Sequence, residues 1–430
     1  MGTPASVHAR EWGAAAAARR PGRWRDRAIE AVLLLGIGSG FVLALVNANV
    51  SVVRPAMTYA LELAIYMACF ALGLWRLDRD RAALVVGGLG VLVALVLLRY
   101  VASWQFDPKF MRDALIAFAF LVLGAAYRGQ VPRLCLWLAL LVAVVAAFEL
   151  AAPQLYGDLV NPKSYFVNAR GASAAGFWNE DSNLYVSATR PNARNFLASS
   201  ELPRASSIFV EPVTMGNFII FLAAVVLAFG RRLAPLARLA AFALVLFLVV
   251  ASDGRLAAGT CVLMLLVAPV FARLDQRMAF AVFAAVLLAG AGLVHVAGVE
   301  AFDDTMLGRI FFSVQSIEGL SLRQWLGLEP GAAYRYFDSG IAYFIASQSL
   351  PGVIAFALGY SFLLILPGVE GRLFKHLAIF AFALSLLVSN GYFSIKTAAL
   401  WWFVCGWAWQ ARPRLAAPGD AASAGTEPQR

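Results

Sequence analysis

The sequence has little charge, little histidine and little cysteine for its length. Of its 430 residues, 14% are charged and 61% are hydrophobic, and only 3 are histidine and 4 cysteine. Such a composition excludes two or three ordinary soluble domains and indicates a polytopic membrane protein. Each cysteine stands inside an apolar run without metal-ligand spacing, so we expect neither a disulfide framework nor a zinc site. These residues are Cys69, Cys135, Cys261 and Cys405.

Several sequence signatures are also missing. The chain has no Gly-x-x-x-x-Gly-Lys-Ser/Thr phosphate loop, no Gly-x-Ser-x-Gly elbow and no His-Glu-x-x-His pair, which argues against ATP-driven transport and zinc proteolysis. Lys and Arg number 35 against 25 Asp and Glu, a formal charge of +10. In a membrane protein this excess is typical of basic cytoplasmic loops, and we do not expect nucleic-acid binding.

Long apolar runs separated by short charged loops predict an all-α protein with about twelve membrane-spanning helices. A span needs about 20 mostly apolar residues. The fourth, eleventh and twelfth runs are short, so ten or eleven crossings with re-entrant segments is the alternative. The predicted spans are 28–46, 55–75, 82–98, 114–126, 134–150, 213–229, 236–251, 256–271, 278–296, 341–366, 377–388 and 397–409.

Basic residues gather in alternate short loops and in both terminal segments, which predicts that the two termini are cytoplasmic. The first apolar run is too long for a signal peptide and should stay attached. The predicted organisation is a disordered N-terminus (1–27), spans one to five (28–150), a large external loop (151–212), spans six to nine (213–296), a second large external loop (297–340), spans ten to twelve (341–409) and a disordered tail (410–430).

The two long external loops are rich in aromatic residues and arginines. Aromatic faces stack on sugar rings, and one guanidinium group can donate two parallel hydrogen bonds to a phosphate. The loops therefore predict a phosphate-bearing glycan ligand. Interfacial aromatic residues and solvated loop charges are the alternative interpretation. The candidate glycan-path residues are Trp178, Trp325, Tyr334 and Tyr336.

Single charges at the membrane edge give a sharper indication. Arg255 stands between two apolar runs with almost no loop, and Arg204 and Glu211 precede the sixth span. Charges so placed are costly and often functional, although an arginine at a helix end can also extend its charge to the interface. Glu62 lies inside the second span, where we expect a hydrogen-bonded interhelical group and consider a proton relay second.

Three short motifs carry a family resemblance. Residues 204–212 (RASSIFVEP) resemble an Arg-x-Ser/Thr-Gly-x-Phe-x-x-Pro entry into a span, and residues 252–256 (SDGRL) resemble a Ser-Arg-Gly segment, although here the arginine follows the glycine. Residues 325–331 (WLGLEPG), 338–343 (DSGIAY) and 350–352 (LPG) resemble a Gly-x-Gly loop, a His-Asn-x-x-Leu element and a Gly-Leu-x-Gly segment. Together they resemble the O-antigen ligase and Wzy-type polysaccharide polymerase superfamily, closest to the polymerases of exported polysaccharides such as xanthan.

The resemblance implies a multi-pass glycosyltransferase of the bacterial inner membrane, with both large loops periplasmic. It would polymerise undecaprenyl-pyrophosphate-linked oligosaccharides in exopolysaccharide or O-antigen biosynthesis, together with a flippase and a chain-length regulator. No cofactor is implied. The external loops contain no Asp-x-Asp motif, which agrees with a reaction that needs no metal ion.

The resemblance also suggests roles for individual residues. Ligases of this superfamily place a histidine in the last large periplasmic loop, where this chain has Asp338, and the difference favours a polymerase. Asp338 or Glu211 is the candidate base. Ligase activity and transport of lipid-linked glycans remain the alternatives. The candidate pyrophosphate ligands are Arg204, Arg255 and Arg309, with Arg323 and Arg335 extending the site.

Overall fold

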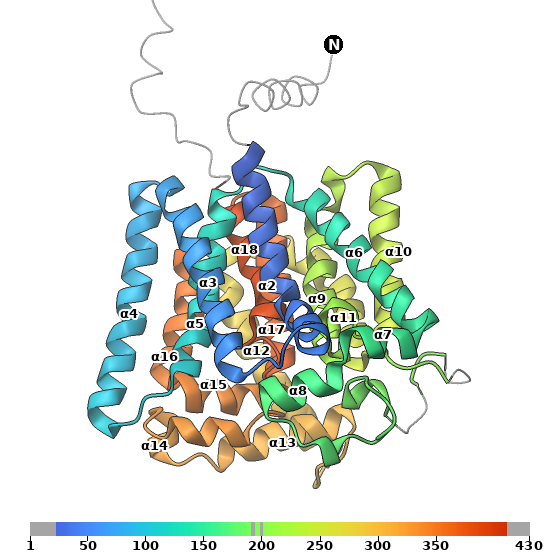
Figure 1. Cartoon of the computed structure of the whole chain (residues 1–430). Helices are drawn as coiled ribbons and strands as arrows, with labels where there is room; N and C mark the ends of the chain where they lie inside the picture. The colour runs from blue at the N-terminus through green and yellow to red at the C-terminus, as the bar shows by residue number, and fades with distance from the viewer. Residues whose placement is uncertain (1–22, 191–193, 198–200, 411–430) are drawn as a thin grey trace, which may run out of the picture.

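The computed structural model describes residues 23–190, 194–197 and 201–410, which form a bundle of helices without a strand (Figure 1). The long helices are α2 (Arg23–Asn49), α3 (Pro55–Gly73), α4 (Arg79–Ser103), α5 (Pro108–Ala126), α6 (Val131–Ala151), α9 (Pro212–Phe229), α10 (Pro235–Ser252), α11 (Arg255–Phe271), α12 (Ala279–Ala297), α17 (Gly368–Leu386) and α18 (Ile395–Trp409). Shorter helices are α7 (Pro153–Val160), α8 (Pro162–Arg170), α13 (Met306–Glu318), α14 (Leu322–Trp325), α15 (Gly340–Gln348) and α16 (Leu350–Leu358).

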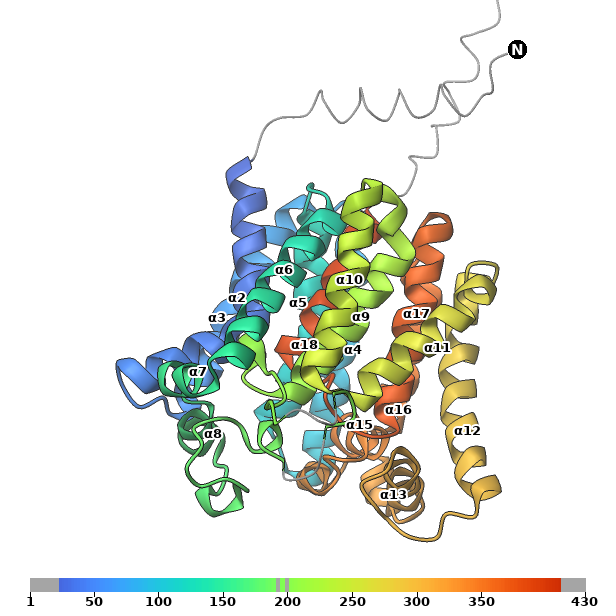
Figure 2. The same cartoon turned by 90° about the vertical axis from the view of Figure 1, so that its right-hand side faces the viewer.

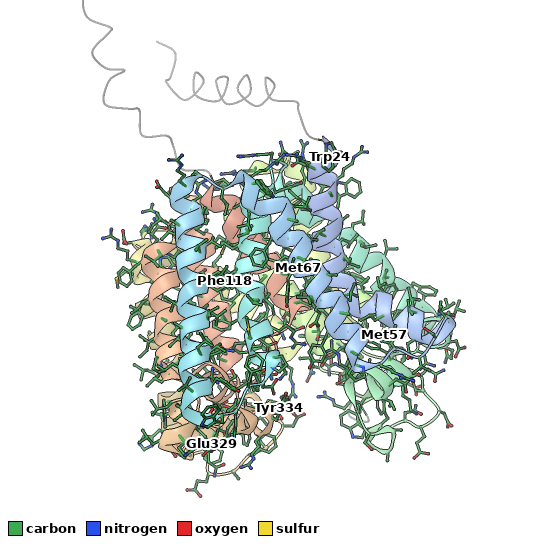
Figure 3. The ribbon with its side chains drawn as sticks, turned by 60° about the vertical axis from the view of Figure 1, so that its left-hand side comes forward. Trp24, Met57, Met67, Phe118, Glu329 and Tyr334 are labelled. Carbon is green, nitrogen blue, oxygen red and sulfur yellow. The ribbon has the colours of Figure 1, made fainter. Side chains whose placement is uncertain are left out.

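The described chain begins and ends at the same end of the bundle (Figures 1 and 2). At the opposite end, α8, α13 and α14 lie across the ends of the long helices, and we call this the loop end. Figure 3 shows Trp24 at one end of the bundle and Glu329 and Tyr334 at the other. The two long segments predicted on one membrane face therefore share one end of the molecule.

Seven of the described helices are long and apolar enough to cross a membrane, namely α2, α3, α4, α6, α9, α10 and α12. The bent pair formed by α15 and α16 would be an eighth. An all-α membrane protein is thus supported, whereas the count of twelve stays a prediction. The first turns of α5 are charged, α11 has 17 residues and α18 has 15, so these helices do not meet the same test.

The tenth predicted span, 341–366, was wrong as a continuous helix. α15 ends at Gln348, and the next helical segment runs from Leu350 to Leu363 at an angle of 103°. Ser349 between them has φ 68°, and its side-chain oxygen accepts from the backbone N–H of Gly352. In a continuous helix Pro351 would have no N–H for the Ser347 carbonyl and its ring would clash there, whereas it fits the first turn of a new helix, which explains the break.

The helices differ greatly in how deeply they are buried. α9 is central, with 89% of its apolar window buried, whereas α4 stands at the edge with only 11% buried. α5 and α18 pack closely, because a Cβ on Gly124 would overlap the Phe403 carbonyl and one on Gly406 would overlap that of Leu121. Small residues permit such close approach between membrane helices.

The predicted disordered N-terminus was wrong for its last five residues, because residues 23–27 belong to the first turns of α2. A hydrophobic run shows where the apolar part of a helix starts. The helix itself can begin earlier, with charged first turns that lie in water. The remaining predictions of terminal disorder, for residues 1–22 and 411–430, lie outside the described residues.

Candidate functional site

The corner between α10 and α11 is built by two residues at the loop end. α10 ends at Ser252 and α11 begins at Arg255, with Asp253 at φ 50° as the cap. The buried carboxylate of Asp253 accepts from the side-chain amide of Asn195 at 3.0 Å and from the backbone N–H of Phe196 at 2.8 Å. The corner therefore fastens part of the first long loop onto the helix bundle.

Arg204 is tied to the same corner. Its guanidinium donates to the carbonyls of Ser252 at 3.1 Å, Asp253 at 3.4 Å and Ser187 at 3.4 Å, and lies 3.9 Å from the Asp253 carboxylate. Burial, followed by the positive charge of Arg190, lowers the pKa of Arg204 to about 10. The side chain thus remains a cation at neutral pH, although its main contacts are to backbone oxygens.

Asp304 joins three arginines from separate parts of the chain. Its carboxylate accepts from Arg309 at 2.7 Å and Arg255 at 3.2 Å, and lies 3.5 Å from Arg190. Arg309 also donates to Asp338 at 3.1 Å. Partial burial alone would raise the pKa of Asp304, but the guanidinium groups, led by that of Arg309, hold it below its usual range.

We call this group the arginine cluster: Arg190, Arg204, Arg255 and Arg309 with Asp253, Asp304 and Asp338. Four guanidinium groups meet three carboxylates, so the cluster carries one more positive than negative charge. The sequence-predicted residues Arg204, Arg255, Arg309 and Asp338 come together here from α11, α13 and both long loops. Arg190 and Asp304 were not predicted, because their role depends on how the second loop folds over the corner.

The members of the arginine cluster differ in access to water. The side chain of Arg204 is 12% exposed, whereas those of Arg255, Arg309 and Asp338 are 37%, 32% and 53% exposed. Ion pairs between exposed partners are weak, so a ligand anion can replace a carboxylate there at small cost. Arg204 is better suited to hold the corner in place than to contact a ligand.

Glu211, the second predicted base, lies apart from this cluster. It is the N-cap residue of α9, and its carboxylate accepts from the Thr214 hydroxyl at 2.5 Å. The pKa of the partly buried Tyr185 is raised, first by desolvation and then by the negative charge of Glu211. No hydrogen bond or ion pair joins it to Asp338 within the part of the chain that the structure describes.

A buried carboxylate from α6 holds the segment between Arg204 and Glu211. Glu149 is fully buried and accepts the backbone N–H groups of Ser206 at 2.7 Å and Ser207 at 2.6 Å. Ser207 has φ 50°, a conformation that a non-glycine residue rarely adopts without support. Glu149 thus fixes the backbone that places both predicted site residues.

A second group of charges lies at the start of α5, and the sequence analysis missed it. Glu62 of α3 forms an ion pair with Arg112 of α5 at 2.9 Å, so its partner lies on another helix, although the expected hydrogen bond is not formed by this oxygen. Asp113 accepts from Arg112 at 2.7 Å and from the Tyr343 hydroxyl at 2.7 Å, and Lys109 donates to that hydroxyl at 2.8 Å. We call these five residues the α5 cluster.

The spacing of the three α5 charges could have revealed this cluster. Arg112 and Asp113 follow Lys109 by three and four residues, so one helical face carries all three. The predicted fourth span began at residue 114 and left them outside. The structure extends the helix back to Pro108 and buries Asp113 against α15.

Two predicted arginines lie outside the arginine cluster. Arg323 pairs with Glu329 at 3.0 Å, both on the second long loop, and its side chain is 62% exposed. Arg335 is exposed in the turn before α15. Among the described residues no ion pair connects either of them to Arg255 or Arg309, so their predicted place in one pyrophosphate site is not supported by the geometry.

The predicted aromatic residues are scattered. Trp178 is exposed in the first long loop, whereas Trp325 packs against the main hydrophobic core. The Tyr336 hydroxyl lies 3.5 Å from the Gln324 side-chain oxygen. Tyr334 lies beside the α5 cluster, with its ring centre 4.7 Å from the Lys109 ammonium. A single continuous aromatic path is therefore not formed, and Tyr334 is the member closest to a charged site.

A scan against protein-family models, a search of curated proteins and a search of solved structures each returned no match. The resemblance of the sequence motifs to a known superfamily therefore stays a prediction.

Proposed function

We propose that this protein polymerises undecaprenyl-pyrophosphate-linked oligosaccharide repeat units at the periplasmic face of the bacterial inner membrane. The product would be an exopolysaccharide or O-antigen chain. The observation that carries the proposal is the arginine cluster, which gathers four guanidinium groups and the partly exposed Asp338 at one end of a bundle of apolar helices.

The arginine cluster suits the leaving group of such a reaction. When the glycosidic bond to the carrier breaks, negative charge develops on the lipid pyrophosphate. Arg255 and Arg309 are exposed enough to reach it, and planar guanidinium groups bind phosphate oxygens in pairs. Stabilising charge that develops in the transition state is commonly the largest contribution to catalysis. In this proposal the arginines do what a metal ion does in many sugar-transfer enzymes.

The proposed step forms one bond and breaks one bond. A hydroxyl oxygen at the non-reducing end of the acceptor attacks the anomeric carbon of the donor sugar. The bond from that carbon to the pyrophosphate oxygen breaks, and its electron pair leaves with the lipid pyrophosphate. The hydroxyl proton passes to a carboxylate.

Asp338 is our candidate for that carboxylate. It lies 3.1 Å from Arg309, so a base and a pyrophosphate ligand are adjacent. A general base must be within hydrogen-bond reach of the proton that it removes. The Asp338 carboxylate is half exposed and held by one arginine of the cluster, so it is free to accept a proton from a bound acceptor. Glu211 is the weaker candidate, because its described contacts are to Thr214 rather than to the arginine cluster.

Transport of lipid-linked glycans is the second candidate function, and one observation favours it. The pair α15 and α16 is bent by 103°, and broken helices often form the substrate sites of transporters. Such sites usually arise from two broken helices in corresponding halves of the chain. Among the described helices only this one pair is bent in that way.

A gel profile of surface polysaccharide distinguishes these functions. Wild-type cells, a deletion strain and an Arg255→Ala strain with verified protein level are compared. The polymerase proposal expects single-repeat glycan without long chains in both altered strains. Loss of all external glycan would favour transport, and long chains that remain unattached to their final acceptor would favour a ligase.

A further inference from the structure

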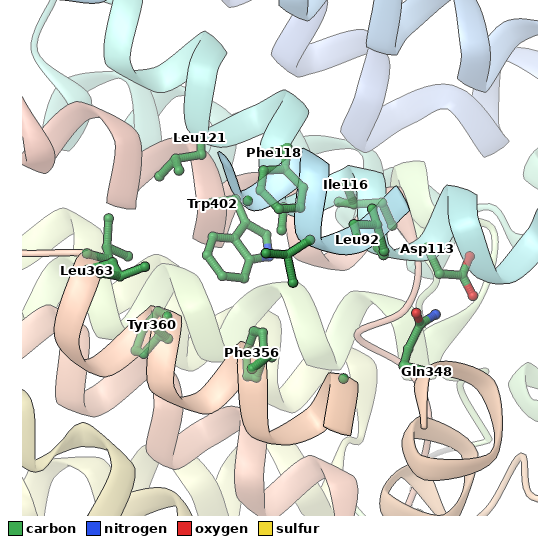
Figure 4. A pocket seen from close by; sticks show the side chains of 18 of the residues that line it. Leu92, Asp113, Ile116, Phe118, Leu121, Gln348, Phe356, Tyr360, Leu363 and Trp402 are labelled. Carbon is green, nitrogen blue, oxygen red and sulfur yellow. The ribbon is translucent and has the colours of Figure 1, made fainter. Parts of the chain in front are cut away.

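A large apolar cavity lies away from the arginine cluster. It has a volume of about 510 Å³ and lies between α4, α5, α16 and α18. Figure 4 shows its lining, with Leu121 and Leu363 towards one end, Phe118, Phe356 and Trp402 in the middle, and Asp113 and Gln348 at the other end. A cavity of this size holds a ligand of ordinary small-molecule volume or a section of a longer chain.

The side of the cavity formed by α4 borders the exterior of the bundle. α4 is apolar, long enough to span a membrane and only 11% buried. Leu84, Leu92 and Val96 of this helix line the cavity, whereas Gly87 and Gly90 on its other face are exposed. In a bilayer the gap beside α4 would therefore communicate with lipid, and the natural occupant of an apolar space at that depth is a hydrocarbon chain.

The polar end of the cavity has a cation with free hydrogen-bond capacity. Arg99, one turn before the end of α4, lines this cavity and also a smaller adjoining one, and its Nε donates to the Gly327 carbonyl at 2.9 Å. Within the described part of the chain its two terminal nitrogens have no hydrogen-bond or ion-pair partner. An apolar cavity with a cation at one end matches a hydrocarbon chain that ends in an anion.

We propose that this cavity holds part of the polyprenyl tail of the acceptor substrate, with the acceptor's phosphate at Arg99. The inference rests on the proposed function, because it assigns the cavity to one of the two lipid-linked substrates of a polymerase. The rest of the tail would leave between α4 and α16 and continue in the bilayer.

The distance to the arginine cluster favours the acceptor over the donor. Gln348 at one end of α15 lines the cavity, and Asp338 precedes the other end. The nine residues of α15 rise by roughly 13 Å in total. The donor's phosphate is bonded to the reacting carbon and must be beside Asp338. The acceptor's phosphate is separated from its attacking hydroxyl by the whole oligosaccharide, so a remote phosphate site suits it.

Photo-crosslinking tests the tail site directly. Purified full-length protein in nanodiscs of phosphatidylethanolamine and phosphatidylglycerol is labelled with undecaprenyl phosphate that carries a diazirine in its tail. Digestion and mass spectrometry locate the label, which we expect on α4, α5, α16 or α18. A diazirine phospholipid in a parallel sample identifies positions that any membrane lipid would label.

Two blocking variants and one matched control sharpen the test. Gly359 lines the cavity and has no atom within 4 Å of an added Cβ, so a side chain can start there, and Gly359→Phe should occupy part of the cavity. Leu92→Trp does the same from α4. Each should reduce labelling about tenfold, since a few displaced methylene groups have an effect of that size. Gly90→Phe, also open but outside the lining, should label as wild type.

The phosphate end has its own comparison. Arg99→Gln should lower labelling by undecaprenyl phosphate roughly five- to tenfold and leave labelling by a diazirine polyprenol unchanged. Arg255→Ala should leave the cavity label intact, because it belongs to the other substrate site. Equal labelling by the phospholipid probe, or full labelling in both blocking variants, would overturn the tail site. Intact cavity labelling in a protein that forms no chains would contradict the proposed function instead.

Discussion

Replacement of Arg255 by alanine separates a role in catalysis from a role in stability. Arg255 donates to the carbonyl and carboxylate of Asp304, at 3.0 and 3.2 Å. The two side chains are 37% and 54% exposed. Ion pairs in such exposed surroundings contribute about 0–1 kcal/mol to stability. Removal of the guanidinium should therefore leave the folded protein almost as stable as the wild type.

The expected effect on the reaction is much larger. If Arg255 stabilises charge that develops on the leaving pyrophosphate, its loss removes one preorganised donor. Loss of such a donor typically lowers the rate about 10²–10³-fold, which corresponds to roughly 3–4 kcal/mol of transition-state stabilisation. Arg255→Lys retains the charge without paired donors and should lose about tenfold.

The assay measures chain growth from purified lipid-linked repeat units by protein in nanodiscs, beside thermal unfolding of the same samples. Arg232→Ala is the matched control, because Arg232 is also an exposed, ion-paired arginine, bound to Glu370 at 2.6 Å beyond the opposite end of α9. A rate within twofold of wild type for Arg255→Ala would refute its role at the leaving group. An equal loss in Arg232→Ala would show that the effect is not specific to the site.

Three further predictions concern the base, the packing and the support of the site. Asp338→Asn should lower the rate of chain growth about 10²–10⁴-fold while binding of the lipid-linked repeat is retained, and an unchanged rate would exclude Asp338 as the base. Gly124→Leu should lower the melting temperature, because overpacking at the Phe403 carbonyl costs about 1–3 kcal/mol or more, whereas Gly87→Leu, with no atom near its Cβ, should melt as wild type. Equal melting of the two glycine variants would contradict the α5–α18 contact. Glu149→Gln weakens two buried hydrogen bonds and should cost about 1–3 kcal/mol in thermal unfolding and lower the rate as well; if neither changes, Glu149 does not hold the loop.

Much of the helical arrangement follows from apolar runs and prolines. The predicted span 213–229 matches α9 to within one residue, because Pro212 fixes the start and the basic Arg231 and Arg232 follow its end. In a membrane, backbone groups must be paired within the segment, so a long apolar run leaves little choice but a helix. The bend at Ser349 coincides with a polar interruption, Ser347 to Ser349, followed by Pro351, but the apolar residues on both sides led to the prediction of one span.

The candidate site was predictable only in part. Only two residues separate the two helices before Arg255, so its place at a helix end could be predicted from the sequence alone. Asp304 pairs with arginines that are distant in sequence, so its role needed the tertiary fold. The α5 cluster was missed because its charges sit in a helix whose apolar part starts after Asp113. Charge in the first turns of a span can mark a polar site inside the bundle.

Reconstitution of the wild-type protein with one substrate tests the central claim most directly. Purified protein in nanodiscs would receive a homogeneous undecaprenyl-pyrophosphate-linked repeat unit, and mass spectrometry would follow both products. The account predicts lipid-linked chains of two and more repeats, with one undecaprenyl pyrophosphate released for each bond formed. Unchanged substrate and no released undecaprenyl pyrophosphate, from protein that is folded and binds the substrate, would contradict it.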